Sequence, residues 1–574
     1  MKRHLAACGV LAVGIGLAAA ANGQSREAPG AAAQVRAFEP VTDAVLANPD
    51  PSDWLHWRRT LDGWGYSPLD QIDRDNVHQL QLAWSWQMRP GLSQPTPLVY
   101  DGVMYLPNPD GYVQAVDAVT GDRIWEFRRI FENTPDENFR NRMRSLAIYG
   151  RNIYVTTADA HLIALDARTG EVVWERAVAD HRLGYRYTSG AIVAEGRIVA
   201  GMTGCERYKN EVCFISAHDP DTGRELWRTS TIAEPGAPGG DTWGDLPLLF
   251  RAGGDAWIPG SYDAATGLMY WSTAQAKPWA RVSRGTDGDA LYTNSVLAIE
   301  PAGGDLRWYH QFVPGESHDL DEVFESVLID NGGRRSVFKM GKLGILWELD
   351  AATGEFIDAH DLGFQTLVSL DRRTGAVSYL PGMIPEAGVE LAFCPDFRGI
   401  RNVMASAYHP QTRALHIPIT PSCTRGIFSE VERQAHPEGD LYFYYNPAWT
   451  GWRTTGSNPH PLSPEHAGQL VAMDIDTGEI RWRHRTATRP LAAALTTGGG
   501  LVVSGDSDRY LFLHDVETGQ VLHRTRLPSP VQGYPMTYAV NGRQYLAIPV
   551  GGGRAPGAPN ALFVFTLPAE PAAR

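Results

Sequence analysis

The sequence has few long apolar runs, few cysteines and a deficit of positive charge. Of its 574 residues, only Leu5 to Ala21 form an extended apolar run, and no later segment is long and apolar enough for a membrane span or a helical bundle. No Cys-x-x-Cys pair occurs among the five cysteines, which argues against a redox dithiol. Lys and Arg number 51 against 65 Asp and Glu, a formal net charge of −14. Such a surface disfavours nucleic acid and anionic membranes and favours a basic protein partner.

The one apolar run lies where an export signal would lie. Met1 to His4 are basic, the run follows, and Asn22-Gly23-Gln24 supplies small residues suited to cleavage. We therefore expect a signal peptide over 1–24, a flexible segment over 25–52 and a periplasmic location. Leu5-Ala6-Ala7-Cys8 imitates a lipoprotein box, but it precedes the run instead of closing it, so a lipid anchor is the weaker alternative.

Cleavage of the signal would leave four cysteines in an oxidising compartment. An even number of cysteines there favours pairing. Nearness in sequence favours Cys205 with Cys213 and Cys394 with Cys423. Free reactive thiols are the alternative.

One motif, A-x-D-x-x-T-G-x-x-x-W, recurs along the chain. Full copies begin at Ala115, Ala164, Ala217 and Ala472, and a copy with two replacements begins at Ala298. Alternating apolar residues lead to Asp, Asp-x-x-Thr-Gly supplies a turn in which Gly takes positive φ, and alternation resumes toward Trp. Each copy therefore predicts a β-hairpin, and its Trp is expected to pack between neighbouring units.

The spacing of the copies predicts the fold. Asp117, Asp166 and Asp219 lie roughly fifty residues apart, which is the length of one four-stranded propeller blade. The longer gaps each hold a further hairpin signal, at Tyr262 to Tyr270 and at Tyr408 to Ile417. We expect an all-β, eight-bladed β-propeller with tryptophan-docking repeats, which forms a single domain over 53–570.

The segment that precedes the repeats resembles a known family. The pattern D-W-x-x-x-x-R-T-x-x-x-x-x-Y-S-P-L-x-Q-I-x-x-x-N-V begins at Asp53, and a strand pair follows at Thr96 to Tyr105. Both are similar to the quinoprotein alcohol dehydrogenases, propellers that hold pyrroloquinoline quinone (PQQ) and a metal ion on the ring axis. The resemblance extends from Asp53 to about Gly553 and implies PQQ together with Ca²⁺ or a lanthanide ion as cofactors.

The resemblance implies metal ligands on separate blades. Glu206 matches the family's metal-binding glutamate, although by itself it would be a surface carboxylate in a hairpin loop. Gln275 stands where an asparagine ligand is usual, and its amide oxygen still suits a hard cation. Asp319 matches the catalytic base and a metal ligand, and Asp321 resembles the extra ligand of lanthanide-using members. The alternative is that both aspartates cap a turn beside His318.

The remaining matches concern the quinone. Lys342 matches the basic residue at the reactive carbonyl, although it could be a solvated lysine at a strand end. Trp257 matches the indole beneath the cofactor, with a blade-packing tryptophan as the alternative. Arg144 matches the arginine that pairs with a quinone carboxylate. The other implied cofactor contacts are Gln94, Ser189, Gly204, Cys205 and Asn402.

Three departures indicate a remodelled site. Relatives often carry adjacent cysteines over the quinone, but the corresponding place near Asn138-Phe139 has none. Gln94 stands where glutamate is usual, and Pro490-Leu491 where a tryptophan-containing contact is usual. These changes predict an altered substrate pocket rather than a lost activity.

The expected function is oxidation of a primary or secondary alcohol to an aldehyde or ketone. Asp319 would take the hydroxyl proton while hydride passes to the quinone, with Lys342 and the metal as electrophiles. The Ser317 to Glu325 loop looks closest to dehydrogenases of sugars and bulky secondary alcohols. No Cys-x-x-Cys-His follows Gly553, so we expect a separate cytochrome c as electron acceptor. A homodimer is one expected assembly, and the alternative function is a non-catalytic propeller scaffold of the outer-membrane assembly type.

Overall fold

The computed structural model describes residues 38–131, 143–206, 208–209, 211–431, 451–551 and 559–569. The expected signal peptide, Asn138-Phe139 and Gly553 lie outside these residues. Within them, no helix is both long and apolar enough to cross a membrane.

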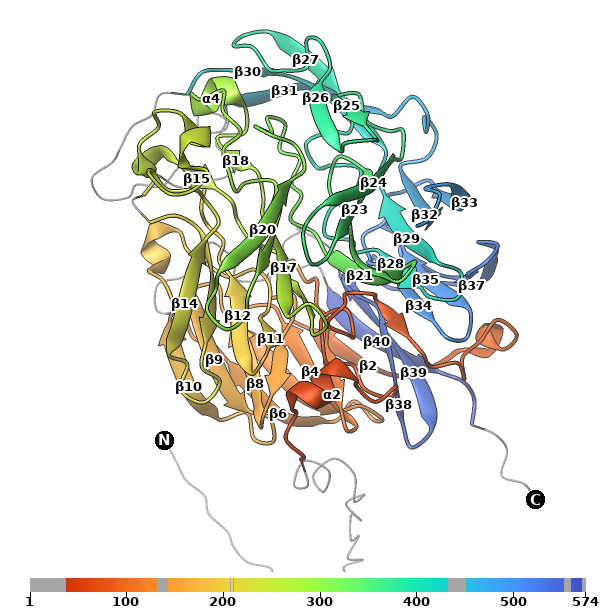
Figure 1. The fold of residues 1–574 in the computed structure, drawn as a ribbon. Coiled ribbons are helices and arrows are strands. Elements are labelled where there is room, and N and C mark those ends of the chain that lie inside the picture. Colours follow the sequence, from red (N-terminus) through yellow and green to blue (C-terminus); the bar gives the residue numbers. More distant parts are fainter. Residues whose placement is uncertain are drawn as a thin grey trace, which may run out of the picture.

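The described residues form a ring of antiparallel sheets (Figure 1). Eight of the sheets have four or five strands, and we assign each of these to one blade. The first four, in chain order of their first strands, are β2 (Gln81–Met88) with β38 (Met536–Val540), β39 (Arg543–Gly551) and β40 (Asn560–Thr566); β3 (Leu98–Tyr100), β4 (Val103–Asn108), β5 (Tyr112–Asp117) and β6 (Arg123–Arg128); β7 (Ala147–Tyr149), β8 (Asn152–Thr156), β9 (His161–Asp166) and β10 (Val172–Ala177); and β11 (Ile192–Ala194), β12 (Arg197–Gly201), β13 (Phe214–His218) and β14 (Glu225–Ser230).

The other four blades complete the ring. They are β16 (Ser261–Asp263), β17 (Leu268–Ser272), β19 (Ser295–Ile299) and β20 (Leu306–Gln311); β21 (Ser326–Asn331), β22 (Arg334–Met340), β23 (Ile345–Asp350) and β24 (Phe356–Asp361); β28 (Ala407–His409), β29 (Ala414–Ile419), β32 (Gly468–Asp474) and β33 (Ile480–Thr486); and β34 (Leu495–Thr497), β35 (Leu501–Gly505), β36 (Tyr510–Asp515) and β37 (Val521–Arg526), with β1 (Tyr66–Ser67) parallel to β34. The predicted all-β propeller is confirmed, and the hairpin signals at Tyr262 and Tyr408 correspond to β16–β17 and β28–β29.

Short elements are inserted between the blades. The additional strands are β15 (Ala252–Gly253) with β18 (Ala276–Lys277), β25 (Val368–Asp371) with β26 (Ala376–Tyr379), and β27 (Glu390–Phe393) with β30 (Ser422–Phe428) and β31 (Trp452–Pro459). The helices described are α2 (Asp43–Ala47), α4 (Arg281–Arg284), and the 3-10 turns η1 (Val77–Gln79), η2 (His181–Leu183), η3 (Gly240–Trp243) and η4 (Leu248–Phe250).

The repeated turn forms as the sequence predicts. Asp166 Oδ1 accepts hydrogen bonds from the amides of Arg168 at 2.9 Å and Thr169 at 3.2 Å. The amide of Gly170 donates to the Asp166 carbonyl at 2.8 Å, with a φ of 72° that an L side chain rarely adopts. The turn therefore joins β9 to β10 in a tight hairpin.

The repeat tryptophans connect neighbouring blades, as expected. Each lies on the turn glycine of the next copy, so that a Cβ at Gly170 would come within 2.6 Å of the Trp125 ring. Each indole Nε1 also donates to the carbonyl of the residue after the turn acid. These bonds are Trp84 to Ala118, Trp125 to Ala167, Trp174 to Pro220, Trp227 to Pro301, Trp308 to Ala351 and Trp482 to Val516, at 2.8 to 3.2 Å.

The ring closes through the two ends of the domain. Strand β2 pairs with β40 from Gln81 opposite Thr566 to Met88 opposite Asn560. Strand β2 thus lies in one sheet with the last three strands described, β38 to β40 (Figure 1). This sheet therefore joins the beginning and the end of the domain and closes the ring.

Residues 38–52 are more ordered than the sequence predicts. Phe38, Val41 and Leu46 are buried in the core beneath the third blade, and α2 begins after the N-cap Thr42. Val41 also pairs with Gly150. The prediction of a flexible segment up to residue 52 was therefore wrong for 38–52, because Phe38, Val41 and Leu46 anchor this stretch in the core.

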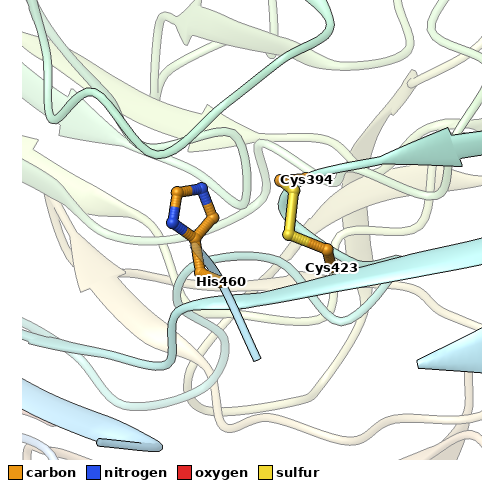
Figure 2. Close-up of side chains that lie close together, drawn as sticks. All are labelled: Cys394, Cys423 and His460. Atoms are coloured by element: carbon orange, nitrogen blue, oxygen red, sulfur yellow. A yellow bond between two sulfur atoms is a disulfide. The ribbon is translucent and has the colours of Figure 1, made fainter. Parts of the chain in front are cut away.

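Both predicted disulfides are present. Cys205 bonds to Cys213, and Cys394 bonds to Cys423. The second bond ties the end of β27 to β30, and His460 lies beside it, with the ring and sulfur atoms within 4.8 Å of one another (Figure 2). This disulfide precedes a loop, residues 397–404, that reaches the central cavity.

Candidate active site

A cavity of about 840 Å³ lies where the blades converge. Each blade contributes lining residues from the connection before one of its strands, namely β3, β7, β11, β16, β21, β28, β34 and β38, and five blades contribute further residues from the connections after β12, β17, β22, β29 and β35. Only the centre of the ring is within reach of all eight blades. The volume falls in the range of sites that hold a cofactor or small ligand.

Most of the expected site residues line this cavity. Those that do are Gln94, Arg144, Glu206, Trp257, Asp319, Asp321, Lys342 and Asn402. Pro490 and Leu491 also line it, at the rim position where the sequence departs from the family pattern. Residues far apart along the chain are therefore brought together.

Four expected residues do not line the cavity in the described structure: Ser189, Gly204, Cys205 and Gln275. The Ser189 side chain is buried, and Thr188 lies on the wall in its place, because neighbouring residues of an extended segment point to opposite sides. Gly204 and Cys205 instead hold the segment before Glu206. Their amides donate to Asp255 Oδ1 at 2.8 and 3.1 Å, and the disulfide of Cys205 anchors the loop.

Asp319 and Asp321 project from the loop between β20 and β21. Asp319 has a φ of 63°, a left-handed conformation that Asp tolerates at some strain. The Gln275 side-chain amide donates to Asp319 Oδ1, and the Gln275 backbone amide donates to Asp321 Oδ1 at 3.2 Å. Gln275 thus orients both carboxylates from behind the cavity wall.

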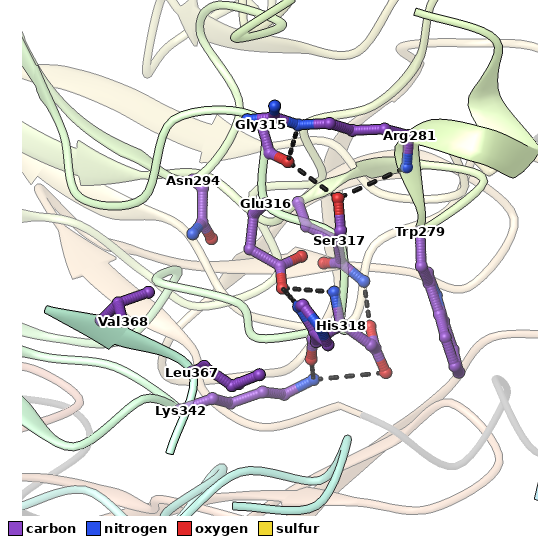
Figure 3. Close-up of polar contacts among 12 residues, drawn as sticks. Trp279, Arg281, Asn294, Gly315, Glu316, Ser317, His318, Lys342, Leu367 and Val368 are labelled. Carbon is purple, nitrogen blue, oxygen red and sulfur yellow. Dashed lines mark hydrogen bonds and ion pairs between the residues drawn. The ribbon is translucent and has the colours of Figure 1, made fainter. Parts of the chain in front are cut away.

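Lys342, in the turn between β22 and β23, contacts the same two carboxylates. Its Nζ donates to the Asp319 carbonyl at 2.6 Å and lies 2.9 Å from Asp321 Oδ2 and 3.5 Å from Asp319 Oδ2. Figure 3 shows the extended Lys342 side chain with dashed contacts from its nitrogen. Burial would lower the pKa of Lys342, but the charges of Asp319 and Asp321 hold it above its usual value. The lysine therefore carries a permanent positive charge beside the expected base.

Burial also changes the acidity of the carboxylates. It raises the pKa of Asp319 to about 6, although Lys342 and Lys277 oppose the shift. It would raise that of Glu206 as well, but the charges of Arg186 and Lys277 outweigh it and lower the pKa to about 2. Glu206 is thus ionised throughout the neutral range, whereas the Asp319 carboxyl can exchange a proton near neutrality.

The cavity also contains residues that the sequence reasoning missed. They are Arg186, Thr188, Asp255, Lys277, Trp279, Arg398 and Arg401. Arg186 Nη2 lies 2.5 Å from Glu206 Oε1, and Lys277 Nζ lies 3.8 Å from Asp319 Oδ1. Lys277 stands two residues after Gln275, and a lysine inside that motif could have indicated a charged residue in the site. No comparable sequence feature marked Arg186.

The wall that faces these charges is aromatic. The Trp279 and Phe397 rings stack with centroids 5.9 Å apart, and Trp452 and Trp257 complete the lining. The Arg144 guanidinium lies 5.3 Å from the Trp257 ring centroid. A flat, anionic, aromatic ligand suits a site of this composition.

The residues fit both groups that the resemblance implies. PQQ is a planar tricarboxylate, and the cavity combines indole surfaces with Arg144, Arg186, Lys342 and Arg398. For a metal ion, Glu206 Oε2 and Gln275 Oε1 are buried without a hydrogen-bond partner. Such oxygens are the ligands that hard cations prefer.

An all-β propeller with a charged and aromatic central cavity places the chain in the class of propeller dehydrogenases that bind a quinone. Residues 54–359 and 468–546 match the family model described as PQQ: glucose/ethanol/alcohol dehydrogenase, beta-propeller domain. The chain is 31% identical to the quinoprotein alcohol dehydrogenase PedH of Pseudomonas putida over 533 residues. The aligned region covers 86% of this chain and 85% of that protein. The chain is also 31% identical to the dehydrogenase subunit of the quinone alcohol dehydrogenase of Acetobacter aceti, over 89% of this chain and 72% of that subunit.

Solved structures agree with this assignment. The quinohemoprotein alcohol dehydrogenase ADHIIG of Pseudomonas putida superposes with a TM-score of 0.81 at 26% identity, over 94% of this chain and 84% of that chain. A europium-containing methanol dehydrogenase shares the fold, with a TM-score of 0.83 at 23% identity over 92% of this chain and all of that chain. The chain therefore belongs to the PQQ-dependent glucose/ethanol/alcohol dehydrogenase family and is a quinoprotein alcohol dehydrogenase, which sets aside the scaffold alternative.

Proposed function

We propose that the protein oxidises bulky, largely apolar alcohols, with Asp319 as the general base. The assignment of the base rests on a buried carboxyl, whose pKa is raised to about 6 by burial, that lies 3.5 Å from the permanent charge of Lys342. A base of this acidity is ionised at neutral pH and still accepts a proton effectively.

The chain's own residues would divide the work as follows. Asp319 takes the hydroxyl proton, while Lys342 stabilises negative charge beside it. Arg144 and Trp257 would hold PQQ, which when bound accepts the hydride from the alcohol carbon. Glu206, Gln275, Asp319 and Asp321 would hold the metal ion. The aromatic wall of Trp279, Phe397 and Trp452 excludes water and favours a bulky substrate over methanol or a sugar.

The setting of the enzyme belongs to the same proposal. A basic amino terminus followed by an apolar run supports export to the periplasm, and two disulfides support an oxidising compartment. The acidic composition supports a basic electron acceptor such as a cytochrome c. The proposed oligomeric alternatives are monomer and homodimer.

Reconstitution with PQQ and Ca²⁺, followed by dye reduction, tests the activity. We expect a higher kcat/KM for an arylalkyl alcohol such as 2-phenylethanol than for methanol or glucose, by about tenfold or more, since each buried methylene adds about 0.8 kcal/mol. Equal or better turnover of glucose would contradict the substrate class. Failure of every alcohol together with failure to bind PQQ would contradict the function itself.

Asp319→Asn tests the base. The amide keeps the size of the side chain but cannot accept the proton, so we expect turnover to fall by about 10²–10⁴-fold while the Kd for PQQ stays within a few-fold. Asp166→Asn, a change of the same kind in an outer hairpin turn, is the matched control and should keep wild-type turnover. Activity of Asp319→Asn near the control would remove Asp319 as the base.

A further inference from the structure

Lys277 occupies a position among the site's carboxylates that the general mechanism does not require. Its Nζ lies 3.8 Å from Asp319 Oδ1, its charge also acts on Glu206 and Asp255, and only 4% of the residue is exposed. The backbone of Lys277 is fixed, because Lys277 belongs to β18 and pairs with Ala252 of β15. The ammonium group is therefore built into the cavity wall.

The three carboxylates of the expected metal site each face a cationic side chain. Arg186 lies 2.5 Å from Glu206, and Lys342 lies 2.9 Å from Asp321. Asp319 lies between Lys342 and Lys277, at 3.5 and 3.8 Å. Asp321, whose extra charge favours a lanthanide on sequence grounds, is thus already neutralised by a lysine.

Ligand charge decides how a hard cation site discriminates between ions. An ion bound to Asp319 Oδ1 at about 2.4 Å cannot lie more than about 6 Å from Nζ, given the 3.8 Å between Nζ and that oxygen. With an effective dielectric constant near 20, each unit of ion charge at about 6 Å then weakens binding by about 100-fold. A trivalent ion carries one more unit of positive charge than a divalent ion, so its binding is weakened by a further factor of about 100.

We infer that Lys277 makes the metal site selective for a divalent ion, calcium by its oxygen donors, against trivalent lanthanides. The inference rests on the proposed function for the existence of the site and goes beyond it in choosing the metal. Lys277 is then a specificity-determining residue: its charge repels every cation, but it repels a trivalent ion most.

Metal affinities of the full-length protein test the inference without turnover. Tb³⁺ binding is followed by luminescence sensitised by the cavity tryptophans, and Ca²⁺ binding by competition and calorimetry. Lys277→Met removes the charge at similar volume, and we expect the ratio of Kd for Ca²⁺ to Kd for Tb³⁺ to rise by about 100-fold. Lys277→Arg keeps the charge and should leave the ratio within about threefold of wild type.

Three results would overturn the inference. One is an unchanged ratio in Lys277→Met, with its folding verified by an unchanged melting temperature. Another is a ratio in Lys277→Arg that rises as far as in Lys277→Met, which would assign the effect to shape. The third is a wild-type protein that takes up neither ion. A separate PQQ titration distinguishes these results from failure of the proposed function, since PQQ binding can succeed whichever ion is preferred.

Discussion

Replacement of Arg144 by methionine should weaken PQQ binding while the fold is kept. Arg144 Nη1 donates to the carbonyls of Thr188 and Trp257 at 2.8 and 3.3 Å, and Nε donates to Gln94 Oε1 at 3.0 Å. These contacts hold the guanidinium at the cavity wall with only 5% of the residue exposed. A carboxylate of PQQ would be bound here by charge-assisted hydrogen bonds.

The expected magnitude follows from burial. A hydrogen bond to a charged group contributes about 1.5–3 kcal/mol, and a partly desolvated arginine–carboxylate pair lies in this range. Loss of about 2 kcal/mol raises the Kd for PQQ about 30-fold. Arg144→Lys keeps the charge but loses the planar fork, so its Kd should rise by a smaller factor, about tenfold or less.

The assay is quenching of tryptophan fluorescence by PQQ, since Trp257 and Trp279 line the cavity. Arg123→Met is the matched control: Arg123 is not among the lining residues, 54% of its side chain is exposed, and it is paired with Glu126 at 3.3 Å. Its Kd should stay within about threefold of wild type, because exposed ion pairs contribute little. A Kd for Arg144→Met as close to wild type as this, or an equal loss in both variants, would refute the assignment of Arg144.

Two further predictions concern stability. Gly170→Ala should lower the free energy of unfolding by about 2–4 kcal/mol, because strain at positive φ adds to a clash with Trp125. Gly150→Ala is the control: Gly150 also has positive φ but has open space around it, so the loss should be about 1–2 kcal/mol. Equal shifts in melting temperature for the two variants would contradict the docking role of Trp125. For His416, burial lowers the pKa from 6.5 to about 3, so below pH 6.5 the unfolded chain gains a proton that the folded protein does not. The stability of the wild type relative to His416→Gln should therefore fall by about 2 kcal/mol from pH 7 to pH 5 in urea unfolding, and parallel pH curves would exclude this linkage.

The architecture was predictable because its determinants are local and repeated. Asp166, Gly170 and Trp174 belong to one hairpin, and their spacing in each copy reports the turn, its positive φ and the interblade contact. The packing of 38–52 was not predictable in this way. This stretch occurs once, so no repeat reports its packing, and Phe38 and Leu46 are buried because they lie against the third blade.

The site was predictable where a motif carried it and not where packing decided it. Glu206, Asp319 and Lys342 were found through the resemblance, and the structure brings Asp319 and Lys342 within 3.5 Å of each other. Thr188 and Ser189 are neighbours in an extended segment, so their side chains point to opposite sides. A shift of one residue would exchange them, and the sequence does not specify which of the two faces the cavity. Arg186 becomes a partner of Glu206 only through the loop that the Cys205–Cys213 bond closes.

The pairing of β2 with β40 has a consequence for biogenesis. Synthesis delivers the amino-terminal strand β2 first, yet its sheet also needs β38 to β40, which are made last. Until β40 arrives, both edges of β2 lack a partner strand, so pairing with other chains competes with folding at this stage. Removal of the last hairpin should therefore harm folding yield far more than the number of deleted residues suggests.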